Sequence, residues 1–193
     1  MTATWAIAFG AESPVLAVPW HDDDGRIAYI DLRAQPERIG EIPEARENPV
    51  LAHVLARLNA LESPWATAKC DRWPLDEDDL QAAALHLDLD GAQAGIGSYI
   101  DLYHRDAAKF ASLEDHRDLL QRLTRAAEKS GPPAAMLELT LRHCIAEGAE
   151  GYAITAFLHA VGEDAARAQT NWEAALAALA QILLNERQKL QHG

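Results

Sequence analysis

The chain has few of the residues that mark disulfide-stabilised secreted domains or nucleic-acid-binding proteins. Only two of its 193 residues are cysteines, Cys70 and Cys144, and they form no Cys-x-x-Cys pair, which argues against a disulfide framework. Lysine and arginine number 17 against 30 acidic residues, so the net charge is −13. Nucleic acid and anionic membrane surfaces attract basic patches, and we therefore expect neither as a partner.

Long apolar runs and targeting segments are also missing. No window approaches about 18 consecutive apolar residues, the length that a membrane-spanning helix requires. The first basic residue is Arg26, so the apolar start of the chain lacks the positively charged n-region of a secretory signal. These features predict a cytoplasmic protein without a membrane segment.

Motifs for catalysis and cofactor binding are absent as well. The sequence contains no Gly-x-Ser-x-Gly, no His-Glu-x-x-His and no phosphate-binding glycine loop, so no cofactor is predicted. What the chain does have is 49% hydrophobic residues, enough for a substantial core at this length. We expect a single domain over residues 1–193.

Helical periodicity is clearest in three segments, where apolar residues recur at three- and four-residue spacing: 49–61, 113–130 and 165–190. Asn48 before Pro49, and Ser112 before an acidic turn, are typical helix N-caps. A short helix after Asp76 is a weaker prediction, because residues 85–90 alternate and are equally typical of an extended segment.

Alternating segments predict six strands, at 15–20, 26–33, 65–73, 97–103, 136–145 and 152–159. The first two flank the acidic turn 22–25 and the last two flank a glycine-rich turn, so each pair is expected to form a hairpin. The sequence therefore predicts an α+β fold, with a mainly antiparallel sheet of about six strands covered by three to four helices.

A tetrapeptide repeat suggests an internal duplication. Tyr29-Ile-Asp-Leu32 recurs as Tyr99-Ile-Asp-Leu102, and a helix and a proline follow each copy at nearly the same offset. Two β-α-β repeats, over about 25–75 and 95–145, would explain this order. The alternative is a short match between two ordinary strands.

The repeat also suggests an acid pair. In each copy Tyr and Asp lie on one face of the strand, so a pseudo-twofold axis would bring Asp31 and Asp101 together, with Tyr29 and Tyr99 beside them. Paired carboxylates permit general acid–base catalysis or metal binding. The alternative is that each aspartate caps a loop or faces solvent.

A second candidate site contains His86, Asp88 and Asp90, which stand at alternate positions before a glycine. The pattern fails as a calcium loop, because a histidine takes the first position and Gly97 stands where a bidentate glutamate is required. As a transition-metal site it would need ligands from elsewhere in the chain, and a purely structural role is the alternative.

The segment 71–90 holds seven acids and one base, which predicts a solvated face or a docking patch for a basic protein partner. Two functions follow from these observations. The first is a non-catalytic binding or accessory protein that acts through an exposed sheet face and this acidic patch. The second is an enzyme with a carboxylate-lined site around Asp31 and Asp101, which could act with or without a metal ion. We expect a homodimer in either case, because exposed sheet edges tend to find a twofold mate.

Overall fold

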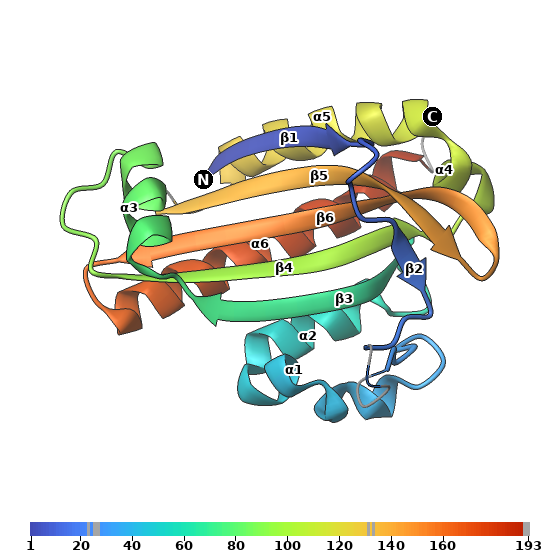
Figure 1. Cartoon of the computed structure of the whole chain (residues 1–193), viewed down its shortest axis with the longest axis horizontal. Coiled ribbons are helices and arrows are strands. Elements are labelled where there is room, and N and C mark those ends of the chain that lie inside the picture. Colours follow the sequence, from blue (N-terminus) through green and yellow to red (C-terminus); the bar gives the residue numbers. More distant parts are fainter. Residues whose placement is uncertain (23, 25–27, 131, 133, 191–193) are drawn as a thin grey trace.

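The computed structural model describes residues 1–22, 24, 28–130, 132 and 134–190, with side chains described as far as residue 186. Its centre is one six-stranded sheet with strand order β1-β5-β6-β4-β3, in which β2 pairs with β5 beyond the end of β1 (Figure 1). The strands are β1 (Thr2–Ala8), β2 (Leu16–Val18), β3 (Trp65–Pro74), β4 (Ala94–His104), β5 (Ala135–Ala146) and β6 (Ala149–Gly162).

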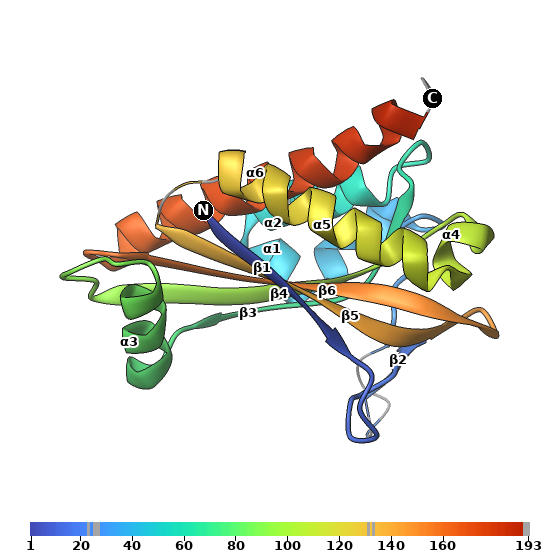
Figure 2. The same cartoon turned by 90° about the horizontal axis from the view of Figure 1, so that it is seen from above.

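Helices cover one face of this sheet. Figure 2 shows α2, α5 and α6 on one side, with α3 and β2 on the other. The helices of the described residues are η1 (Pro36–Glu41), α1 (Pro43–Glu47), α2 (Pro49–Leu58), α3 (Glu77–His86), α4 (Ala107–Ala111), α5 (Leu113–Ser130) and α6 (Ala165–Leu190). None of those helices is long and apolar enough to cross a bilayer.

The three periodic helices and four of the strands are confirmed. The predicted caps form: the Asn48 side chain accepts from the Leu51 N–H at 2.9 Å, and the Ser112 hydroxyl accepts from the Asp115 N–H at 3.1 Å. The β5–β6 hairpin turns through two residues with positive φ, the second of them Gly148, a geometry that suits the twist of paired strands. One detail was wrong, since Leu61 lies beyond the end of α2 and is 86% exposed.

The α+β class and a sheet of six strands are also confirmed, although β1 was not among the predicted strands, and the sheet is mixed and not mainly antiparallel. Both β1 and β2 run parallel to β5, a strand more than a hundred residues away in the sequence. No local turn in the sequence predicts such a pairing. The described residues also form seven helices and not three or four, because short segments such as α3 and α4 are each started by a capping aspartate, Asp76 and Asp106.

The predicted strand 26–33 is a second correction. Arg26 and Ile27 lie outside the described residues, and residues 29–32 belong to no strand. Among the residues described in this segment, a single bridge between His21 and Ala28 forms where a hairpin was expected. The Asp31 carboxylate accepts from the backbone N–H groups of Arg33 and Ala34, and this local turn replaces strand pairing.

The duplication stays a prediction, but its tetrapeptide does not mark equivalent strands. Tyr99–Leu102 lies within β4, whereas Tyr29–Leu32 lies in a turn region. A different regularity is present in the sheet. The units α2-β3-α3-β4 and α5-β5-β6 each end on a central strand, and β4 and β6 pair antiparallel at the middle of the sheet.

The main hydrophobic core lies between the sheet and the helices. Two fully buried tryptophans connect these layers through their indole N–H groups. Trp172 of α6 donates to the Ser98 hydroxyl of β4 at 2.8 Å, and Trp65 of β3 donates to the Leu183 carbonyl of α6 at 3.0 Å. The helix layer is therefore fixed to the sheet by directional bonds as well as by apolar burial.

This packing predicts the effect of truncating one core residue. Leu120 of α5 is fully buried against the sheet, so Leu120→Ala is expected to lower the free energy of unfolding by about 2–5 kcal/mol. The matched control is Leu61→Ala, at an 86% exposed position, with an expected change within about 0.5 kcal/mol. Urea denaturation measures both, and equal effects would contradict the placement of α5.

Candidate functional site

Described residues cover the face of the sheet opposite α2, α5 and α6 at its two ends. At one end β2 and the segment after it pack on the sheet in a second apolar cluster with Tyr103, Phe110 and Cys144. At the other end stands α3 (Figures 1 and 2). Between them no helix of the described residues covers the stretch of β5, β6, β4 and β3, which we call the open face.

A row of aromatic side chains crosses this open face. Trp73 of β3, Tyr99 of β4 and Phe157 of β6 follow one another with ring centroids 6.3 and 5.9 Å apart. We call these three residues the aromatic row. Gly97 makes room for it, because a Cβ at that position would lie 2.5 Å from the Trp73 ring. All three rings are partly exposed, so they form a platform and not a core.

Beside Tyr99 and Phe157 the open face sinks into a hollow of about 330 Å³, which we call the central hollow. Its floor is polar, its rim carries the two aromatic rings and two cations, and an apolar segment before β2 closes one side. The lining residues are Pro14, Val15, Leu16, Lys69, Tyr99, Asp101, Arg142, Thr155 and Phe157.

The floor of the hollow is formed by a buried carboxylate that accepts a hydrogen bond from a hydroxyl. Asp101 is 6% exposed, and the Thr155 hydroxyl on the neighbouring strand donates to its Oδ1 at 2.5 Å. Burial raises the pKa of Asp101 above its ordinary value, while the Thr155 hydrogen bond and the charges of Arg142 and Lys69 oppose that rise. Burial likewise raises the pKa of the Tyr99 phenol to about 12, so Tyr99 stays protonated at neutral pH.

Two cations converge on the same place. Arg142 of β5 lies with its guanidinium carbon 5.7 Å from the centre of the Phe157 ring, and its Nε is buried with no hydrogen-bond partner. Lys69 projects from a bulge in β3 and lies over the Trp20 ring at 4.4 Å. The hollow therefore holds two cations and one carboxylate, a locally positive site in a chain of net charge −13.

Of the predicted acid pair, only one member lies here. Asp101 and Tyr99 line the central hollow, but Asp31 and Tyr29 do not. Asp31 instead accepts from the Arg33 side chain at 3.3 Å, and Arg33 also bonds Glu147 at 3.0 Å. Burial raises the pKa of Asp31, but these Arg33 hydrogen bonds outweigh it and the pKa is lowered overall. The two aspartates thus belong to separate hydrogen-bond systems.

The predicted metal ligands are not gathered either. His86 is the last residue of α3, Asp88 has positive φ, and Asp90 lies in the turn that follows. Across the described residues, no group of three histidine, cysteine or acidic side chains is placed to hold a metal ion together, and these three are no exception. Residues 87–90 form a turn and not an extended strand, so the three side chains do not share one strand face as the alternating pattern predicted.

The residues that the sequence analysis missed are Lys69, Arg142, Thr155 and Phe157. Strand alternation contained part of the information, because Arg142 falls on the face opposite Leu139 and Leu141. What it lacked was the register that sets Asp101 opposite Thr155 and Tyr99 opposite Phe157. Comparison of the chain with protein-family models, with curated proteins and with solved structures finds no match.

The buried carboxylate predicts a stability effect with a defined pH dependence. Because burial raises the pKa of Asp101, its ionised form opposes folding at neutral pH. Asp101→Asn keeps an oxygen for the Thr155 hydroxyl and is expected to raise the free energy of unfolding at pH 7 by about 0.5–2 kcal/mol.

The gain should shrink as the pH falls through the raised pKa and vanish below the ordinary value, where Asp101 is neutral in both states. Urea denaturation across this pH range measures it. Asp90→Asn, at an exposed turn position, is the control. A gain that is the same at every pH would show that the carboxylate charge is not its cause.

Proposed function

We propose that the protein is a non-catalytic binding protein whose open face holds an extended segment of a partner protein. The observation that carries this proposal is the aromatic row, which ends on the buried, unpaired Nε of Arg142. Partly exposed tryptophan, tyrosine and arginine side chains are the types that dominate binding energy at protein interfaces. Nothing in the core requires them on this face, because the main core lies on the other side of the sheet.

The length of the surface favours a peptide segment over a small metabolite. Trp73, Tyr99 and Phe157 come from three adjacent strands, and Arg142 comes from a fourth. With strands about 4.8 Å apart, this platform is roughly 14 Å wide. A metabolite in the central hollow would contact Tyr99 and Phe157 but would make no contact with Trp73, which does not line the hollow.

Charge along the strands of the open face gives the bound segment a direction. The cations Lys69 and Arg142 line the central hollow, whereas Trp73 lies near the end of β3 that leads to α3, within the acidic segment 71–90. Trp73 contacts His159 at 6.2 Å, and burial lowers the pKa of His159 while the nearby Asp79 carboxylate opposes that change. The partner segment accordingly has an apolar or aromatic middle, an acid over the central hollow and a base toward α3.

The same charges disfavour nucleic acid, although stacking on exposed aromatic rings is how many proteins hold single strands. Such proteins add a basic groove along the phosphate backbone. Here the acidic segment 71–90 lies where that groove would have to continue.

Selection from a random peptide library displayed on phage tests the proposal. We expect enriched peptides that combine aromatic or aliphatic residues with an acid on one side and a base on the other. Arg142→Gln should weaken their binding about tenfold or more, since it removes a charge-assisted contact. Tyr99→Leu should weaken it as well, through loss of a stacking ring.

The matched control is Arg125→Gln, which makes the same charge change at an exposed position of α5 on the helix side. Peptides that bind all three variants as well as the wild type would overturn the proposal. A second copy of the chain is the other occupant to consider. Analytical ultracentrifugation would reveal it as a dimer that dissociates in Arg142→Gln but not in Arg125→Gln.

A further inference from the structure

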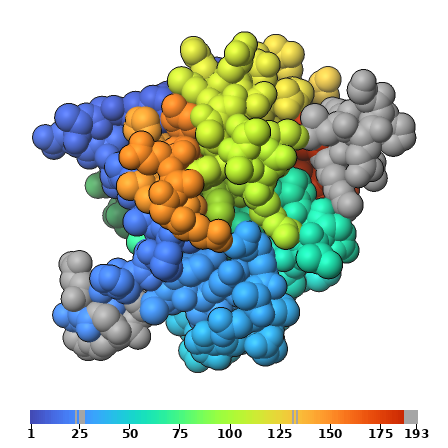
Figure 3. Space-filling view, turned by 90° about the vertical axis from the view of Figure 1, so that its right-hand side faces the viewer, coloured from blue at the N-terminus to red at the C-terminus, as the bar shows by residue number. Residues whose placement is uncertain are grey.

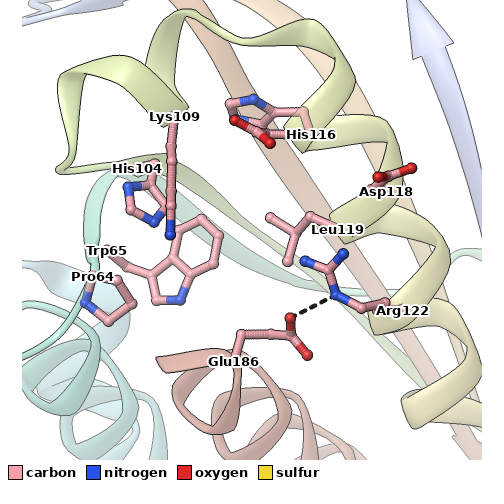
Figure 4. A pocket seen from close by; sticks show the side chains of 10 residues that line it. Pro64, Trp65, His104, Lys109, His116, Asp118, Leu119, Arg122 and Glu186 are labelled. Carbon is pink, nitrogen blue, oxygen red and sulfur yellow. Dashed lines mark hydrogen bonds and ion pairs between the residues drawn. The ribbon is translucent and has the colours of Figure 1, made fainter. Parts of the chain in front are cut away.

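A second hollow, of about 260 Å³, lies on the helix side of the sheet, away from the aromatic row. Figure 4 shows α5 and α6 on two sides of it, with α4 above and the start of β3 opposite α5. The space-filling view shows the α4–α5 segment next to the chain that leads into β3 (Figure 3). Three segments that are distant in sequence therefore build this hollow: the start of β3, the stretch from His104 through α5, and α6.

Its inner wall is apolar. Trp65 is 1% exposed and Leu119 is 8% exposed, and Pro64 completes the wall. The Trp65 indole N–H is already used by the Leu183 carbonyl, so the ring offers only its apolar surface to the hollow. Such a wall suits the body of a small apolar molecule.

Two hydrogen-bond donors stand at the upper side. The Lys109 side chain reaches down between His104 and Trp65 (Figure 4), and within the described residues it makes no ion pair with an acid. His104 Nδ1 accepts from the Asp106 N–H at 2.9 Å, so the proton of the neutral ring is on Nε2. Burial and the Lys109 charge lower the pKa of His104 to about 4, so this ring is neutral at pH 7.

The remaining charges of the hollow are balanced or lie on exposed positions. Arg122 Nε donates to Glu186 at 2.9 Å, which pairs these two side chains with each other. His116 donates from Nδ1 to the Ser112 carbonyl at 2.8 Å, and burial lowers its pKa, so it adds no charge. The exposed acids Asp115 and Asp118 also line the hollow, and their negative charge disfavours multiply charged anions more strongly than singly charged ones.

We infer that this hollow binds a small organic monocarboxylate with an apolar body. The carboxylate accepts from Lys109 Nζ and His104 Nε2, and the body lies against Trp65 and Leu119. A volume of 260 Å³ restricts the ligand to an acid about the size of benzoate or hexanoate. This site does not depend on the proposed function, because it lies on the opposite side of the sheet and shares no residue with the central hollow.

Ligand-observed NMR with the purified full chain tests the site, with benzoate, hexanoate, benzyl alcohol and benzylamine as probes. We expect saturable binding of at least one of the two acids, about tenfold weaker binding of the alcohol, and no binding of the amine. Lys109→Met keeps the apolar stem and should weaken binding of the acid about tenfold.

Two further variants keep the inference falsifiable. His104→Asn leaves an oxygen to accept from the Asp106 N–H but removes the Nε2 donor, and it should also weaken binding of the acid. Lys129→Met removes the same charge at an exposed position in the last turn of α5 and should leave binding unchanged. The inference is overturned if neither acid saturates, if the alcohol binds as tightly as the acids, or if Lys129→Met weakens binding as much as Lys109→Met.

Discussion

The register of β4 against β6 is the constraint on which both faces of the sheet depend. Side chains alternate between the faces of a strand, so a slip of one residue would exchange every apolar and polar position. In the observed register Asp101 lies opposite Thr155 and Tyr99 opposite Phe157 on the open face. The residues that alternate with these along each strand face the helices. Among them is Ser98, whose hydroxyl accepts from the Trp172 indole N–H and so holds α6 on the central strand pair.

One consequence is that an acidic chain presents local positive charge. The net charge of −13 is spread over the molecule, yet Lys69 and Arg142 approach the same hollow from strands that are not neighbours in sequence or in the sheet. Partial burial strengthens their field there, because fewer water molecules screen it. An anionic group is therefore attracted to the central hollow, although the chain as a whole is negatively charged.

Local patterns predicted α2, α5 and α6 and the four strands that carry the open face, because apolar periodicity and caps act within a few residues. They also placed Asp101 and Tyr99 on one strand face. The same reasoning failed at Asp31, where a carboxylate that bonds two nearby backbone N–H groups forms a turn. It missed β1 as well, whose pairing with β5 is decided by a strand at the other end of the chain.

The sequence by itself determined the helices α2, α5 and α6 and the strands β3 to β6, and most of the residues that lie on their apolar side. Only the tertiary structure decided that the sheet is mixed, that Asp101 accepts from Thr155 whereas Asp31 pairs with Arg33, and that Lys69 and Arg142 share a hollow. The physical reason is the distance along the chain over which each effect acts. Periodicity and capping depend on neighbours within one or two turns, whereas register and strand order depend on how distant surfaces pack together.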